Sequence, residues 1–172
     1  MPKAPYPVLP KVSPVRRAEH EDLVAVARLH AENFAEAWSE DYWRQQISDV
    51  GDAAETSARL YVSSLEADEL AGSLVGMLLA RRVVDEAEIL TIAVANTYRQ
   101  QGVAKRLLDK LIVDLRCDLP CRLFLEVSVA NAAALALYAS YGFTTVGTRK
   151  DYYRAAGKAP VDAKVLALEL RN

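Results

Sequence analysis

Hydrophobic positions in the first half of the chain follow a helical period and then a strand period. Residues 18–34 carry largely apolar side chains at helical spacing, namely Leu23, Val26, Ala27, His30 and Phe34. Residues 38–48 predict a second helix with Ser39 as its N-cap. Strand-like segments follow at residues 59–66, 70–84 and 86–95, separated by acidic and glycine-containing turns. We therefore expect two helices and then an antiparallel meander, with a short strand over residues 12–17 before them.

The second half of the chain contains one further long amphipathic segment and one strongly apolar segment. Residues 102–117 predict a helix with a single apolar face, made of Val103, Leu107, Leu108, Leu111, Ile112 and Leu115. Residues 121–129 form a continuous apolar stretch, which predicts a central strand covered on both faces. Asn131 is expected to cap a short helix that runs to Tyr141, with Gly142 at its C′ position.

Two strands, over residues 143–152 and 162–171, complete the pattern, with Gly157 and Pro160 in the loop between them. This order predicts an α/β fold: a mixed, mostly antiparallel sheet of about seven strands flanked by about four helices. The helix after the fourth strand is then a crossover between parallel strands. Residues 1–13 are rich in proline and are expected to form an arm ahead of a single domain over residues 14–172.

Composition narrows the function classes. A net charge of −2 gives no reason to expect nucleic acid as a partner. No apolar run reaches the length of about 18 residues that spans a bilayer, and the N-terminus lacks a signal-peptide pattern, so we expect no membrane partner and a cytoplasmic location. Cys117, Cys121 and two histidines match neither a disulfide framework nor a zinc site.

The helix over residues 102–117 opens unusually, in the stretch "YRQQGVAKRLL" from Tyr98 to Leu108. Gly102 and Ala104 stand where a capping side chain is more usual, so the first backbone N–H groups stay accessible at the positive end of the helix dipole. Such a start binds phosphate groups, and Arg99, Lys105 and Arg106 add positive charge. The alternative is an ordinary strand-to-helix turn with solvated basic residues. The stretch is neither a Walker loop nor a GxGxxG motif.

The same stretch carries a family resemblance. "RQQGVA" is similar to the Q/R-x-x-G-x-G/A signature of the GNAT superfamily of N-acetyltransferases. The chain also resembles that superfamily in the order of three blocks: "LTIAVANTYRQQGVAKRLL", "LFLEVSVANAAALALYASYGF" and "RKDYY". The resemblance extends over about residues 14–170 and is greatest to the RimI-type branch, which acetylates the N-terminal alanine of a ribosomal protein.

The resemblance implies a single GNAT-like domain with acetyl-CoA as co-substrate and no metal. It implies that the backbone of Ile92, Ala93 and Val94 pairs with the pantetheine arm, with the Val94 N–H as an oxyanion donor. It places the pyrophosphate on Gln100, Gln101, Gly102, Val103, Ala104 and Lys105, and an asparagine beside the coenzyme at Asn131. From its position alone, Asn131 can equally be a helix cap only.

Two residues match the catalytic pair of the branch: Glu126 as general base and Tyr138 as general acid. Glu126 interrupts an apolar strand, and burial favours a carboxyl group that accepts protons at a higher pH. The alternative for Glu126 is pairing with a neighbouring cation or backbone N–H. Tyr138 lies two helical turns after Asn131, and its alternative role is core packing through the ring.

The acceptor side is implied by Tyr152 and Tyr153, which match a tyrosine pair that lines the peptide groove of N-terminal acetyltransferases. Glu88 is a candidate second base or ligand of the acceptor amine, and Trp38 either closes the acceptor side or anchors the first helices. The expected acceptor is a protein or peptide N-terminus, such as a ribosomal N-terminal alanine. A small amine or lysine side chain, or a non-catalytic CoA-binding module, are the alternatives.

Overall fold

The computed structural model describes residues 11–48, 56–66, 73–117, 121–154 and 159–170. The strands are β1 (Arg16–Arg17), β2 (Thr56–Ser64), β3 (Leu74–Val83), β4 (Glu86–Val94), β5 (Cys121–Ser128), β6 (Thr144–Tyr153) and β7 (Val161–Leu170). The α-helices are α1 (Leu23–Asn33), α2 (Glu40–Ser48), α3 (Val103–Arg116) and α4 (Ala132–Ser140), with 3-10 turns at His20–Asp22 and Asn96–Tyr98.

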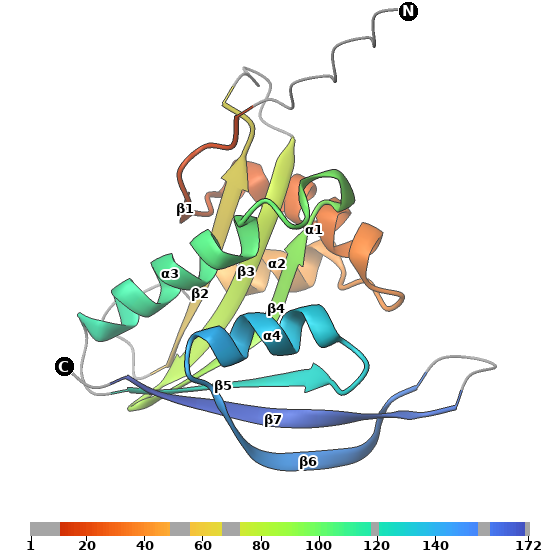
Figure 1. Cartoon of the computed structure of the whole chain (residues 1–172). Helices are drawn as coiled ribbons and strands as arrows, with labels where there is room; N and C mark the ends of the chain where they lie inside the picture. Colours follow the sequence, from red (N-terminus) through yellow and green to blue (C-terminus); the bar gives the residue numbers. More distant parts are fainter. Residues whose placement is uncertain (1–10, 49–55, 67–72, 118–120, 155–158, 171–172) are drawn as a thin grey trace, which may run out of the picture.

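All seven strands form one sheet in the order β1-β2-β3-β4-β5-β7-β6. Every neighbouring pair is antiparallel except β4 and β5, which are parallel and joined by the crossover helix α3. In Figure 1 the strands β2–β4 stand upright, with β2 and β4 pointing upward and β3 downward, whereas β5, β7 and β6 run across the lower part of the molecule. The predicted mixed α/β architecture is confirmed.

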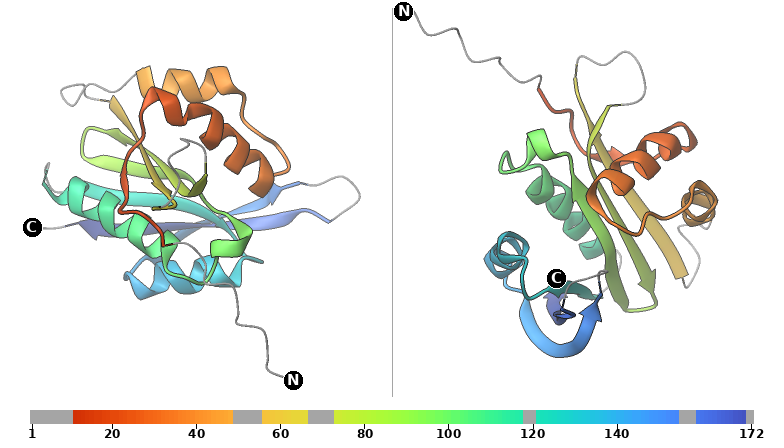
Figure 2. Two further views of the ribbon diagram at one scale, coloured as in Figure 1. Left: turned by 90° about the horizontal axis from the view of Figure 1, so that it is seen from above. Right: turned by 90° about the vertical axis from the view of Figure 1, so that its right-hand side faces the viewer.

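Two hydrophobic cores lie on opposite faces of this sheet. Helices α1 and α2 cover one face over β2–β4, and α3 and α4 lie on the other face (Figure 2). The first core contains the predicted apolar face of α3, including Leu107 and Leu111, both fully buried. The second core surrounds Val26 and Trp43. Each helix therefore buries one apolar stripe against the sheet.

The side chain of Trp38 helps to anchor α1 to α2. It stacks on His30 of α1 at 4.7 Å between ring centroids, and it packs at a tilt against Tyr42 of α2 at the same separation. The Trp38 backbone N–H donates to Nδ1 of His30 at 3.4 Å, and burial lowers the pKa of this histidine. Ser39 accepts from the Tyr42 N–H at 3.2 Å, as expected of an N-cap.

Two expectations need correction, and a third falls on residues that the structure does not describe. The strand expected over residues 12–17 is only Arg16–Arg17, with an isolated bridge from Val12 to Leu65. Residues 1–10 of the proline-rich arm, and Gly157, lie outside the described residues. Strand β5 is central but not covered on both faces: Leu123, Leu125 and Val127 are buried in the core, whereas the alternate side chains are only half-buried. The reason is that α4 covers one face only, which leaves the other open for a pocket.

Two carboxylates, the buried Asp22 and the half-buried Asp114, predict how stability responds to acid. Asp22 accepts two hydrogen bonds from Arg16 at 2.6 and 2.8 Å, and Asp114 accepts from Lys110 and from Tyr61, both at 2.7 Å. Burial alone would raise the pKa of both carboxyl groups, but these hydrogen bonds outweigh it and hold both pKa values below the ordinary range.

Both carboxylates therefore stabilise the fold above the unfolded-state pKa, which is near 3.9, and lose that contribution as the pH falls through the folded-state pKa. Urea unfolding should show a loss on the order of 1 kcal/mol for each carboxylate between pH 7 and pH 3. The variant D114N should be less stable at pH 7 and should show a smaller change between the two pH values. An equal change in D114N and the wild type would contradict this assignment.

Candidate active site

Strands β4 and β5 separate at one end of the sheet, and the candidate site lies at this opening. The two parallel strands pair only from Glu86–Arg122 to Ile89–Leu125, although both continue further. On its other edge β4 changes register with β3: Leu79 lies opposite Thr91 and Ala80 opposite Ile89, so Leu90 is an extra residue. Such a bulge bends its strand and increases its twist. The bend separates the end of β4 from the end of β5.

The backbone of Ile92, Ala93 and Val94 lies on the separated part of β4. These residues pair with β3 only, opposite Leu78, Met77 and Gly76. The N–H of Ala95 donates to Val75 of β3 at 2.9 Å. Because successive amide groups of a strand point to opposite edges, the N–H of Val94 faces away from β3 and toward the opening. The expected backbone ladder is thus sterically possible here.

The start of α3 has the open geometry that its sequence predicts. The N-cap Gly102 has a φ of +78°, provides no side-chain cap, and a Cβ built on it would meet nothing within 4 Å. Gln100 also has a positive φ, of 61°. The N–H of Arg106 makes the bond to the Gly102 carbonyl, so the amides of Val103, Ala104 and Lys105 precede the first intrahelical hydrogen bond. Gln100, Gln101 and Lys105 are exposed around this turn.

Arg99 does not add charge to this turn in the way that the sequence suggested. Its Nη2 donates to Oδ1 of Asn33 at 2.7 Å, and its Nε donates to the Val94 carbonyl at 3.3 Å. The side chain therefore joins the end of β4 to the end of α1. Nothing local in the sequence could reveal this contact, because Asn33 lies 66 positions earlier.

Helix α4 carries Asn131 and Tyr138 on the same face of the sheet as α3. Asn131 caps α4, with its Oδ1 accepting from the Ala134 N–H at 3.1 Å, and its side chain is exposed. Tyr138 is 4% exposed and packs edge-on against Phe143 at 5.5 Å. Burial, together with the charge of Tyr153, raises the pKa of Tyr138 to about 12. The nearby Tyr141 fixes α4 to α3 by donating to Asp109 of α3.

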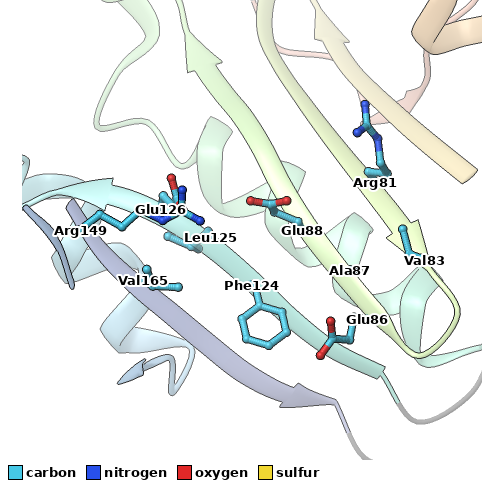
Figure 3. Close-up of a pocket in the computed structure, with 10 residues that line it drawn as sticks. All are labelled: Arg81, Val83, Glu86, Ala87, Glu88, Phe124, Leu125, Glu126, Arg149 and Val165. Carbon is cyan, nitrogen blue, oxygen red and sulfur yellow. The ribbon is translucent and has the colours of Figure 1, made fainter. Parts of the chain in front are cut away.

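On the opposite face of the sheet, Glu126 lies in a cavity of about 300 Å³ beside the opening. Figure 3 shows this cavity between β4, β5 and β7, with Glu88 of β4 across from Glu126. The Glu126 side chain is 13% exposed and pairs with Arg149, whose Nε lies 2.7 Å from Oε1. The pairing of Glu126 with a neighbouring cation, which the sequence left as an alternative, is therefore present in the structure. The role of Glu126 as general base stays a prediction.

The tyrosine pair ends β6 and reaches the same carboxylate. The interaction of the Tyr152 hydroxyl with the Glu126 carboxylate, with some burial, raises the pKa of Tyr152 to about 12. Burial and the charge of Glu126 raise the pKa of Tyr153. The two rings meet edge-to-face at 5.1 Å and both stay partly exposed. A register shift between Arg149 and Tyr153, with Asp151 at a φ of 52°, turns the strand here.

The structure thus brings together Glu126, Glu88 and Tyr152, with Tyr153 and Tyr138 adjacent. Sequence reasoning missed the other residues that line the cavity, among them Arg149, Phe124 and Arg81. Arg149 opens the quoted block "RKDYY", and Phe124 precedes Glu126 by two positions on its strand, so strand alternation places it on the same side. Arg81 lines the cavity from β3, and its Nη2 donates to Oε1 of Gln46 of α2 at 3.1 Å.

Among the described residues, no group of three or more His, Cys, Asp or Glu side chains is placed to hold a metal ion. Within the same part of the chain, no helix is both long and apolar enough to cross a membrane. Cys117 is exposed and has no disulfide partner.

Known proteins are similar to this chain in both sequence and fold. Residues 23–143 match the profile of the Acetyltransferase (GNAT) family. The ribosomal protein bS18-alanine N-acetyltransferase of Salmonella typhimurium is 32% identical over 149 residues, which cover 87% of this chain and 92% of that protein. Its counterpart in Escherichia coli is 37% identical over 99 residues, which cover 58% of this chain and 66% of the E. coli protein, just under two thirds.

The crystal structure of the E. coli alanine N-acetyltransferase has a TM-score of 0.77 to this chain at 29% identity, covering 93% of this chain and 94% of the other. Fold and sequence together place the chain in the class of N-acetyltransferases. It belongs to the Acetyltransferase (GNAT) family, whose acyl donor is acetyl-CoA. The family resemblance of the sequence is therefore confirmed.

Proposed function

We propose that this protein transfers the acetyl group of acetyl-CoA to the α-amino group of a protein N-terminus, with a ribosomal protein N-terminal alanine as its acceptor. The observation that carries the proposal is the position of Glu126, in a cavity beside the opening between β4 and β5. The names of the Salmonella and E. coli relatives support an alanine acceptor. Such an enzyme acts in the cytoplasm, and the net charge of −2 supports a protein rather than a nucleic acid partner.

The coenzyme is proposed to bind on the α3 side of the sheet. The accessible amides of Gly102–Lys105 and the side chains of Gln100, Gln101 and Lys105 are the groups that would hold its pyrophosphate. The edge of Ile92–Val94 that faces the opening would accept the pantetheine arm, and the Val94 N–H would donate to the thioester oxygen. Asn131 is the proposed side-chain contact at the start of α4.

The acceptor is proposed to enter from the opposite face, where Glu126, Glu88, Tyr152 and Tyr153 lie. Glu126, directly or through one water, takes a proton from the acceptor ammonium. The free amine nitrogen forms a bond to the thioester carbonyl carbon, and the carbon–sulfur bond breaks. Tyr138 gives its hydroxyl proton to the departing thiolate. The nitrogen then loses its second proton to solvent, and solvent later returns to Tyr138 the proton that its hydroxyl gives up. Because burial raises the pKa of Tyr138 to about 12, its hydroxyl remains protonated across the neutral range.

Replacing Tyr138 by Phe is therefore expected to lower kcat by about 10- to 100-fold, with acetyl-CoA affinity nearly unchanged. The ring and its contact with Phe143 are retained, so the thermal midpoint should shift little. Stopped-flow or steady-state thiol release measures kcat, and calorimetry measures coenzyme binding. A matched variant is Tyr141→Phe, which removes a hydroxyl bound to Asp109 and should affect stability instead. Unchanged kcat in Y138F would remove Tyr138 from the acid role.

The acceptor class is tested with a panel of peptides beginning with Ala, Ser or Met, together with spermidine. Release of CoA thiol from acetyl-CoA reports turnover for every acceptor in the same assay. We expect the highest kcat/KM with the alanine peptide and little turnover of spermidine. Turnover of spermidine alone would show a small-amine enzyme. Tight coenzyme binding without turnover of any amine would show a non-catalytic module.

A further inference from the structure

Arg149 contacts the proposed general base from the edge strand β6. Its Nε lies 2.7 Å from Oε1 of Glu126 (Figure 3). Its guanidinium lies 5.4 Å from the centre of the Tyr152 ring. The two partners differ in solvent exposure: the Arg149 side chain is 58% exposed and that of Glu126 is 13% exposed. The arginine can therefore move into water, whereas the carboxylate is held in the cavity wall.

The backbone beneath Arg149 is fixed more firmly than its side chain. Arg149 pairs with Ala163 of β7, and the strand then turns through Asp151, whose N–H donates to Oδ1 of Asp162 at 2.9 Å. The anchored backbone keeps the guanidinium within reach of Glu126. A long side chain on a fixed backbone, with one exposed end, can leave its partner and return to it.

A cation beside Glu126 provides the counter-ion that a mostly buried carboxylate needs. Without an acceptor, Glu126 would be a mostly buried carboxylate beside an apolar wall of Phe124, Leu125 and Val165, and an unpaired buried charge is costly. The acceptor also arrives as a cation, because an α-amino group has an ordinary pKa of about 7.7–8.0. One carboxylate is thus approached by two cations, one from this chain and one from the acceptor.

We propose that Arg149 is a displaceable counter-ion of Glu126, whose guanidinium occupies the place of the acceptor ammonium until the acceptor binds. This inference rests on the proposed function, because it assigns Glu126 to the acceptor amine. Arg149 is a positioning residue in this scheme: it keeps the Glu126 side chain oriented between turnovers and leaves when the ammonium enters. Because Arg149 competes with the acceptor for Glu126, it weakens acceptor binding, and this effect can be measured.

The test is equilibrium binding of an alanine-starting peptide to the protein saturated with CoA, which binds but cannot react. Removing the competing cation in Arg149→Gln should lower the peptide Kd by about threefold to tenfold, the value of a partly exposed ion pair. Arg149→Lys keeps a cation and should stay near the wild-type Kd. Lys150→Gln removes the same charge from the neighbouring position, which has no contact with Glu126, and is the matched control. It should leave Kd unchanged.

A second measurement distinguishes competition between Arg149 and the peptide for Glu126 from a purely structural role of Arg149. In a Glu126→Gln background the carboxylate charge is gone, so Arg149→Gln should no longer change the peptide Kd. A peptide Kd that rises or stays the same in Arg149→Gln overturns the inference alone, provided that the wild type binds and acetylates the peptide. An equal decrease in Lys150→Gln also overturns it, since the effect would then be one of net charge. Failure of the wild type to bind or acetylate any peptide overturns the proposed function and this inference together.

Discussion

Replacing Glu126 by Gln is expected to lower kcat by about 10²- to 10³-fold at neutral pH, while the affinity for acetyl-CoA changes little. Gln keeps the size of the side chain but cannot accept the proton of the acceptor ammonium. The groups proposed to bind the coenzyme lie away from Glu126, on α3 and the end of β4, which is why coenzyme affinity should be preserved. Stability should also be preserved, because Arg149 is 58% exposed and becomes solvated once its partner is neutral.

The loss of kcat in Glu126→Gln should shrink as the pH rises above the pKa of the acceptor amine, because free amine is then present without a base. A kcat profile from pH 6 to pH 10 measures this recovery. Glu88→Gln is the matched control: it removes the carboxylate on the facing strand of the same cavity, and we expect it to raise the acceptor KM more than it lowers kcat. Wild-type kcat in Glu126→Gln at neutral pH would exclude Glu126 as the base.

The second large effect is expected at Gly76, which no site motif includes. Gly76 lies on β3 opposite Val94, and a Cβ built on it would come within 2.5 Å of Cγ1 of Val103. Val103 is buried, β-branched and part of the first turn of α3, so it cannot move aside easily. Gly76→Ala should therefore lift the start of α3, with a loss of about 1–3 kcal/mol in unfolding free energy and acetyl-CoA affinity lower on the order of tenfold.

Urea unfolding and coenzyme calorimetry measure the two effects of Gly76→Ala. Gly147→Ala is the control, because a Cβ there would meet Val165 at 3.6 Å, an ordinary contact. The double variant Gly76→Ala/Val103→Ala removes the methyl group that causes the conflict, and it should recover coenzyme affinity. Wild-type stability and affinity in Gly76→Ala would mean that the close approach of β3 and α3 does not set the helix start.

Local sequence signals were sufficient for the elements and for the helix start. The period of the apolar residues in α3 gave its buried face, and Asn131 and Gly142 marked the ends of α4 correctly, with Gly142 at a φ of 86°. The open turn at Gly102 was also predictable, since glycine adopts the required positive φ without strain. These features depend on residues a few positions apart.

Features that depend on distant residues were not predictable from one sequence. The bulge at Leu90 arises from pairing with β3, and the separation of β4 from β5 follows from it. The contacts of Arg99 with Asn33 and of Arg149 with Glu126 join elements far apart in the chain. The apolar run of β5 suggested burial on both faces, but strand alternation puts Phe124 and Glu126 at a cavity instead. An apolar strand next to a binding pocket has the same composition as a fully buried one.

The central claim is acetyl transfer to an α-amino group through Glu126. Its most direct test is to incubate the protein and acetyl-CoA with a peptide that begins with Ala and contains one internal Lys, and to locate the added acetyl group by tandem mass spectrometry. A second peptide of the same sequence with a blocked N-terminus is run beside it. We predict an acetyl group on the α-amino nitrogen of the first peptide, none on the blocked peptide, and a product yield from Glu126→Gln that is strongly reduced. Acetylation of the lysine at equal rates in both peptides would contradict the account.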